Sequence, residues 1–235
     1  MQVRAGNAWR GAVRVMLLAG LLTGCSEAAP TEEKDRDATV SASADGAGGT
    51  VAASGGTLGG AGSACELPVT FDIAEDWTAE AVDGGSAESG AGASSSDGSD
   101  GELAEDITDA LLHQGPVTLA CEIDAKPAGN IGFIRVWTGD PGEDDARAVL
   151  KAFVAAESGA SKEAYRTFTT GDGLDGVEVE YLYTSEILDE TKKERALTVV
   201  TPDGPVVLHL GGLDTEEHEE MLPAYELAKR TVRGD

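Results

Sequence analysis

The stretch GVEVEYLYTSEILDETKKERALTVVTPDGPVVLHLGG, residues 176–212, contains three apolar segments separated by polar, turn-forming residues. In the first segment the apolar side chains occupy every second position, which places them on one face of a β-strand. These positions are Val177, Val179, Tyr181 and Tyr183. The segments KERALTVVT and PVVLHLGG follow, and Pro202-Asp203-Gly204 between them is typical of a tight turn. The sequence therefore predicts three antiparallel strands joined as a meander.

Segments on both sides of the meander predict further strands, two long helices and a shorter helical segment. LPVTFDI (67–73), VTLACEIDAK (117–126) and IGFIRVWTG (131–139) alternate apolar and polar residues, as strands do. Residues 139–158 and 213–233 instead repeat apolar residues at helical spacing, and the shorter segment 102–115 does so through Leu103, Ile107 and Leu111. Strands and helices in this order favour an α+β fold, in which helices pack on the faces of an antiparallel sheet.

Capping residues predict where the two helices begin. Asp140 and Glu143 have the spacing of a capping box, and so do Asp214 and Glu217. The apolar faces are formed by Ala146, Val149, Leu150, Phe153 and Val154 in the first helix and by Met221, Leu222, Tyr225, Ala228 and Val232 in the second. Pro223 conflicts with the second helix, because proline inside a helix removes a hydrogen bond. It either kinks this helix or marks its true start.

Two cysteines lie within the predicted strands. Cys65 and Cys121 each share the apolar face of their own strand. In an exported protein, two such cysteines favour a disulfide, which would stabilise the fold by about 4 kcal/mol in the chain-entropy account. The alternative is a pair of free buried cysteines, which pack as small hydrophobic residues.

The first 24 residues have the features of a secretory signal. Arg4, Arg10 and Arg14 form a positive region without acidic residues, and the apolar segment that follows is too short to span a bilayer. The segment ends in Leu22-Thr23-Gly24-Cys25, which resembles the bacterial lipobox. This resemblance implies cleavage before Cys25 and a diacylglycerol on its sulfur, which would anchor the protein to the extracytoplasmic face of the cell membrane. The alternative is a signal peptide without lipidation.

Two segments lack a hydrophobic pattern. Residues 25–64 and 83–102 are small, polar and rich in glycine, so they cannot bury enough apolar surface to offset the entropy of ordering. We expect the first to be a flexible tether that joins Cys25 to a single domain at residues 65–235. We expect the second to be a disordered insertion within that domain, and a functional lid is the alternative.

These features together resemble actinobacterial lipoproteins with the PsbP-like fold, including the LpqN type. The resemblance rests on VTFDIAEDW, IGFIRVWTGD, LDGVEVEYLYTS and the ending VVLHLGGLDTEEHEEMLPAYELAKRTV, in addition to the lipobox and the tether. It implies an α/β/α sandwich and a non-enzymatic binding or accessory role in the cell envelope, associated in some members with lipid or glycolipid handling. The insertion and the two cysteines depart from this pattern, and no binding motif matches.

The charge of the chain argues against several partners. The net charge is −26, and removal of residues 1–24 takes away three arginines and no acidic residue, which leaves −29. A nucleic-acid partner is disfavoured because it requires a basic surface. Attraction to anionic lipid headgroups is disfavoured for the same reason, so we expect membrane contact through the lipid anchor.

The sequence contains no signature of a catalytic, metal or cofactor site. HExxH, CxxC and GxSxG are absent, and the glycine pattern GDGLDG at 171–176 leads into a predicted strand and not into a helix, so we interpret it as a turn. A zinc site built from His218 and nearby acidic residues lacks a second histidine four residues on. We interpret His209, in VVLHLGG, as an ordinary strand residue and His113 as a helix-end residue. The sequence therefore predicts no catalytic residue, no metal and no cofactor.

The few aromatic residues are the candidates for a binding site. Trp77, Trp137, Tyr181 and Tyr183 would line a pocket for an apolar or sugar-bearing ligand, unless they only fill the core. The sequence thus predicts a non-enzymatic binding or accessory domain for an envelope lipid, a glycolipid or a secreted protein. One alternative is a structural protein–protein interaction module without a pocket. The other is an enzyme of unrecognised type, which would need a cleft where titratable groups with shifted pKa values converge.

Overall fold

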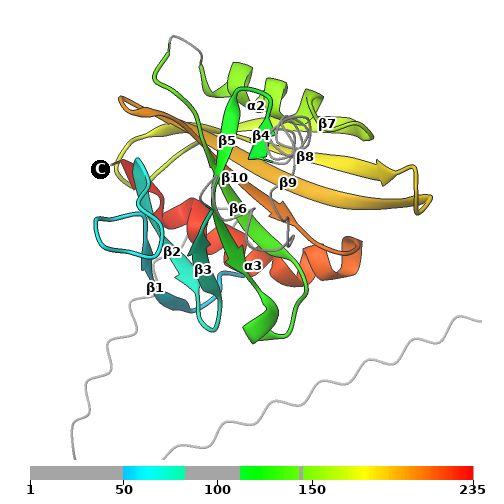
Figure 1. Cartoon of the computed structure of the whole chain (residues 1–235), viewed down its shortest axis with the longest axis horizontal. Helices are drawn as coiled ribbons and strands as arrows, with labels where there is room; N and C mark the ends of the chain where they lie inside the picture. The colour runs from blue at the N-terminus through cyan, green and yellow to red at the C-terminus, as the bar shows by residue number, and fades with distance from the viewer. Residues whose placement is uncertain (1–49, 83–111, 143–144, 235) are drawn as a thin grey trace, which may run out of the picture. The chain divides into compact units, whose positions relative to one another are not determined.

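The meander expected at residues 176–212 is present in the computed structural model as three adjacent antiparallel strands (Figure 1). They are β8 (Asp175–Ser185), β9 (Glu190–Thr201) and β10 (Gly204–Gly211). The structure describes residues 50–82, 112–142 and 145–234. Within these ranges the strands belong to an eight-stranded sheet of order β3-β5-β6-β10-β9-β8-β7, with β4 paired to β5. The other strands are β3 (Thr78–Ala81), β4 (His113–Gln114), β5 (Val117–Asp124), β6 (Phe133–Thr138) and β7 (Ala160–Thr169).

A smaller sheet and two α-helices complete the described part of the chain. The small sheet has the order β1-β2-β11. Its strands are β1 (Ser54–Leu58), β2 (Val69–Ala74) and β11 (Arg233–Gly234), and the helices are α2 (Ala146–Ala155) and α3 (Thr215–Thr231). A short 3₁₀ helix, Lys126–Ala128, joins β5 to β6. The α+β class with a mostly antiparallel sheet is therefore confirmed.

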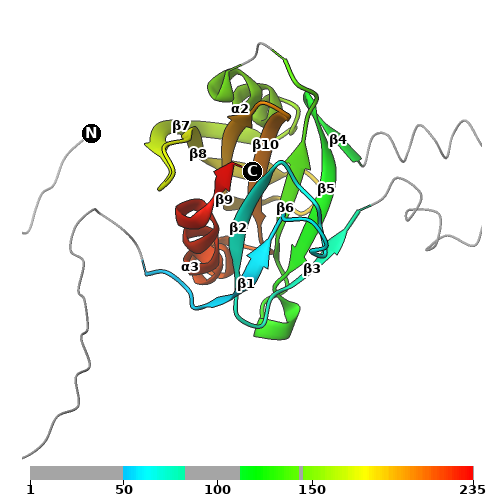
Figure 2. The same ribbon diagram turned by 90° about the vertical axis from the view of Figure 1, so that its left-hand side faces the viewer.

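Two separate hydrophobic clusters lie on the two faces of the large sheet. Successive residues of β10 point to opposite faces: Val206, Leu208 and Leu210 belong to one cluster and Val207 belongs to the other. The buried face of α2 joins the cluster of Val207, as predicted, through Val149, Leu150, Phe153 and Val154. The opposite cluster contains α3 and β2, which lie side by side in Figure 2. The helices thus cover opposite faces of the sheet.

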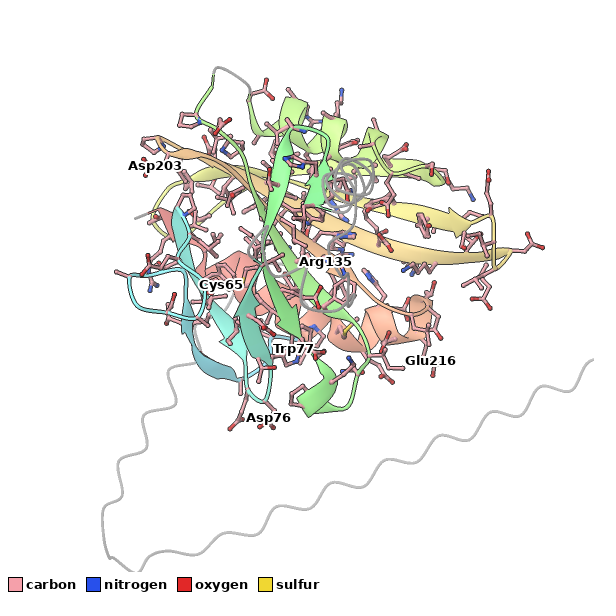
Figure 3. All side chains as sticks on the ribbon, viewed as in Figure 1. Cys65, Asp76, Trp77, Arg135, Asp203 and Glu216 are labelled. Carbon is pink, nitrogen blue, oxygen red and sulfur yellow. A yellow bond between two sulfur atoms is a disulfide. The ribbon has the colours of Figure 1, made fainter. Side chains whose placement is uncertain are left out.

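The expected disulfide is present between Cys65 and Cys121 (Figure 3). Both residues are buried, and their Cα atoms are 6.0 Å apart. Cys121 lies in the middle of β5, whereas Cys65 precedes β2. The bond therefore links the segment before the small sheet to the large sheet, within the hydrophobic cluster that contains α3.

The domain begins earlier in the sequence than residue 65, so the expected tether boundary at residue 64 is wrong. β1 lies within the expected tether and pairs with β2, and Leu58 at its end is buried. Gly59 has a φ of +103°, and a Cβ at this position would lie 1.9 Å from the carbonyl oxygen of Val69. The glycines that indicate flexibility in the sequence here permit close contact between two backbones.

Helix α2 begins at a different cap from the one predicted. Asp145 is the N-cap, and its carboxylate accepts a hydrogen bond from the backbone N–H of Ala148 at 2.8 Å. Asp140 lies five residues earlier, outside the helix. The helix starts directly before its first apolar positions, where a cap can satisfy a free backbone N–H.

Replacing the observed cap should destabilise the protein, whereas replacing the predicted cap should not. We expect Asp145→Ala to lower the free energy of unfolding by about 1 kcal/mol, because the N–H of Ala148 loses its acceptor. Urea unfolding measures this difference. Asp140→Ala is the matched control, and an equal loss in both variants would contradict the assignment of Asp145 as the cap.

Helix α3 has the predicted cap, because Asp214 accepts a hydrogen bond from the N–H of Glu217 at 2.9 Å. Pro223 lies inside this helix and does not mark its start. The Pro223 carbonyl accepts a hydrogen bond from the N–H of Ala52, which attaches the segment before β1 to the helix. None of the helices in the described ranges combines the length and apolar character needed to cross a membrane. Cys25 and the expected insertion at 83–102 lie outside the described residues.

Candidate functional site

Four polar side chains converge between the large sheet and the end of α2. Tyr181 on β8 donates a hydrogen bond to Glu157, 2.6 Å away, and its hydroxyl also lies 3.0 Å from Glu194 on β9. Nε2 of His209 on β10 lies 2.7 Å from Oε2 of Glu194 and 3.1 Å from the Tyr181 hydroxyl. We call Glu157, Tyr181, Glu194 and His209 the His209 cluster.

Strand register explains why three of these residues meet. Tyr181 pairs directly with Glu194, and His209 pairs with Ala196, two positions further along β9. Because alternate residues of a strand share one face, all three side chains point to the face that α2 covers. Glu157 follows α2 and reaches this face from above the sheet.

The cluster holds two carboxylates in different electrostatic surroundings. Burial raises the pKa of Glu157, and the nearby Glu194 carboxylate raises it further. Burial also acts to raise the pKa of Glu194, but His209 and Lys192 outweigh this effect and lower it to about 2. Lys192 contacts Oε1 of Glu194 at 2.8 Å and donates a hydrogen bond to the carbonyl of Gly212. Glu194 is therefore an anion at neutral pH, whereas Glu157 takes up a proton more readily than an exposed glutamate.

A cavity of about 290 Å³ opens beside the cluster, and we call it the His209 pocket. Its wall contains Glu157, Glu194 and His209, the cations Arg135 and Lys192, and the aromatic rings of Phe133, Trp137 and Tyr183. Trp137 is buried, and no acceptor within the described ranges lies in hydrogen-bonding distance of its indole N–H. An unpaired buried donor is costly. Because the nitrogen itself is buried, it gains a partner from a ligand only if binding opens the pocket wall beside Trp137.

A groove lies beside the His209 pocket. A hollow of about 620 Å³ shares Tyr183 and Lys192 with the pocket and is also lined by Leu188 and Leu213. Leu188 and Leu213 are 65% and 60% exposed. We call this hollow the Leu188–Leu213 groove. The pocket and the groove are therefore adjacent, and the groove combines its two exposed leucines with the polar side chains of Glu190 and Asp214.

The structure brings together three of the four aromatic residues predicted to bind a ligand. Trp137 and Tyr183 line the His209 pocket, and Tyr181 belongs to the His209 cluster. Trp77 instead packs in the hydrophobic cluster on the opposite face of the sheet, after β2 (Figure 3). The role of these residues in binding stays a prediction.

The sequence interpretation missed the charged residues of this site. His209 is not an ordinary strand residue, because it is buried against two carboxylates and a phenol. His209 is two residues from Val207 and Tyr181 is two residues from Val179, so the sequence indicates that His209 and Tyr181 lie on the strand faces that α2 covers. The sequence does not give the register in which the strands pair, so it does not show that these side chains meet. His218 is also buried, yet neither ring nitrogen has a hydrogen-bond partner among the described residues. The zinc site considered around His218 is therefore not formed in this part of the chain.

Of the comparisons with known proteins, the family comparison supports the lipoprotein interpretation. The solution structure of cyanobacterial PsbP (CyanoP) from Synechocystis sp. PCC 6803 is similar to this chain with a TM-score of 0.45 and 12% sequence identity. The similarity covers 77% of this chain and 98% of that chain. A TM-score below 0.5 does not establish a common fold, so the PsbP-like sandwich stays a prediction. No curated protein sequence matches the chain significantly. A protein-family model described as "uncharacterised lipoprotein" matches residues 34–232, and the chain therefore belongs to this family of lipoproteins.

Proposed function

We propose that this lipoprotein is a non-enzymatic binding protein of the cell envelope, held at the extracytoplasmic face of the membrane by a lipid on Cys25. Its ligand is a glycolipid, whose sugar enters the His209 pocket while its chain lies along the Leu188–Leu213 groove. The observation that carries this proposal is the adjacency of a polar pocket and a groove with two exposed leucines. A molecule with a polar head and an apolar tail matches this arrangement.

The composition of the pocket favours a sugar as the polar head. Sugar hydroxyls both donate and accept hydrogen bonds, and the pocket offers carboxylate acceptors as well as the donors of Arg135, Lys192 and Trp137. The rings of Phe133 and Tyr183 add apolar surface for a sugar face. A phosphate head is disfavoured because the pocket contains two carboxylates and the chain has a net charge of −26.

An enzyme of unrecognised type would use the same His209 cluster, since titratable groups with shifted pKa values converge there. A general acid or base at neutral pH needs a pKa close to 7, so the lowered pKa of Glu194, about 2, excludes it from this role and leaves Glu157, whose pKa is raised, as the candidate. Lys192 and His209 also hold Glu194 in place by hydrogen bonds. These contacts favour a fixed binding surface over a proton-transfer site.

The alternative of a protein-interaction module without a pocket has one supporting feature. Ile187, in the β8–β9 turn, is 95% exposed, and Leu188 beside it is 65% exposed. However, Leu188 lines a groove that leads to the His209 pocket. Ligand binding accounts for both the pocket and the exposed leucines, so we favour it.

Binding of octyl glucoside below its micelle concentration tests the proposal, because this probe carries one sugar and one short chain. We expect Trp137→Phe to weaken binding about tenfold, since phenylalanine keeps a ring but lacks the N–H. Trp77→Phe is the matched control in the other hydrophobic cluster and should leave the affinity unchanged. Isothermal titration of the secreted chain with Cys25→Ser provides the measurement.

Two results would contradict the proposal. One is an absence of octyl glucoside binding to the unaltered domain. The other is equal weakening by Trp137→Phe and Trp77→Phe, which would indicate a general loss of packing. Octyl phosphate has the same chain with an anionic head, and we expect it to bind more weakly than octyl glucoside.

A further inference from the structure

We propose that Glu157, Glu194 and His209 bind a divalent transition-metal ion, of which Zn²⁺ is the representative. The ligand atoms of these three residues all lie within 4.8 Å of one another. The inference does not rest on the glycolipid proposal, because it concerns the wall of the pocket and not its occupant.

The distances within the cluster suit a small ion. A tetrahedral Zn²⁺ with bonds of about 2.1 Å keeps its ligand atoms roughly 3.4 Å apart. Oε2 of Glu194 and Nε2 of His209 are 2.7 Å apart, and both lie beside the Tyr181 hydroxyl that contacts Glu157. Binding of an ion would have to open the 2.7 Å pair towards about 3.4 Å, and no two of the three ligand atoms are more than 4.8 Å apart. The fourth position would face the His209 pocket, whose wall contains all three residues, although Glu194 and His209 are largely buried in it.

The surrounding groups hold the ligands as metal sites require. Lys192 binds Oε1 of Glu194 and leaves Oε2 directed at His209. Tyr181 donates to Glu157 from within the cluster. Such hydrogen bonds from neighbouring residues orient metal ligands and tune their affinity. A mixture of imidazole and carboxylate ligands favours Zn²⁺ over Ca²⁺ or Mg²⁺, which bind oxygen ligands.

Equilibrium dialysis against ZnCl₂ tests the site in the full chain, purified in detergent, stripped with a chelator and kept in excess CaCl₂. Excess Ca²⁺ occupies weak sites on the acidic surface. We expect about one Zn²⁺ per chain by elemental analysis, and an at least tenfold weaker affinity in Glu157→Gln and His209→Gln. Glu163→Gln, on the exposed edge strand β7, is the matched control and should bind as the unaltered chain does.

Cobalt provides a second measurement that separates coordination from folding. Co²⁺ in a four-coordinate site with a nitrogen ligand gives strong visible absorption, and we expect this signal in the unaltered chain and its loss in Glu157→Gln. Glu157 is half-buried after α2, so this variant should keep the thermal stability of the fold. The proposal is overturned if Zn²⁺ binding is absent, or if Glu157→Gln and Glu163→Gln bind equally well. Octyl glucoside binding measured with and without Zn²⁺ shows separately whether the proposed function holds.

Discussion

Reduction of the Cys65–Cys121 disulfide is expected to lower the free energy of unfolding by about 4 kcal/mol. The bond joins residues separated by 56 positions, and closing so long a loop restricts the unfolded chain strongly. Both cysteines are buried in the α3-side core, so the bond also fixes two sheets to each other. Urea unfolding with and without dithiothreitol measures the difference.

The double variant Cys65→Ala/Cys121→Ala is the control for this experiment. Its stability should match that of the reduced protein to within about 1–2 kcal/mol, the cost of two small buried cavities. Dithiothreitol should not affect it. Equal urea midpoints for the oxidised and reduced unaltered protein would show that the bond does not constrain the unfolded chain.

The fold could be predicted from the sequence wherever one face of an element is buried. Period-two alternation in β8 and the helical spacing in α2 identify residues that do lie in one hydrophobic cluster, such as Val177, Val179, Leu150 and Phe153. The disulfide followed from the same argument, because Cys121 shares the apolar face of β5 and Cys65, although it precedes β2, keeps the phase of the apolar residues that follow it. Burial of one face determines these patterns, and the spacing of the apolar residues can be read from a short stretch of sequence.

Features that depend on backbone contact or on strand register could not be predicted in this way. β1 is stabilised by pairing with β2 and by the fit of Gly59 against Val69, and neither leaves a hydrophobic pattern in a glycine-rich segment. The His209 cluster comes from α2, β8, β9 and β10, so its members are spread over more than fifty positions. A search for local motifs therefore finds no site, although the chain builds one.

Acidification from pH 6.5 to 4 is expected to cost up to about 3 kcal/mol of stability through His218 alone. Burial lowers the pKa of His218 from 6.5 to about 4, and the positive charge of Arg195 contributes. Glu194 and Glu180 act in the opposite direction, and His209 lowers the pKa further. The unfolded chain takes up a proton near pH 6.5, whereas the folded protein resists it until about pH 4. Neutral His218 therefore leaves the free energy of unfolding undiminished above pH 6.5, and this free energy falls as the pH is lowered to 4.

His218→Leu removes this dependence while filling a similar volume on the buried side of α3. Both ring nitrogens of His218 lack hydrogen-bond partners within the described ranges, so the variant should be about 1 kcal/mol more stable at pH 7.5. Its advantage should grow as the pH falls, because leucine has no proton to bind. Other groups with shifted pKa values, such as Glu157, are present in both proteins, so the difference between the two unfolding curves isolates the contribution of His218. A constant difference from pH 7.5 to 4 would mean that the buried imidazole gains a partner or water when it becomes protonated.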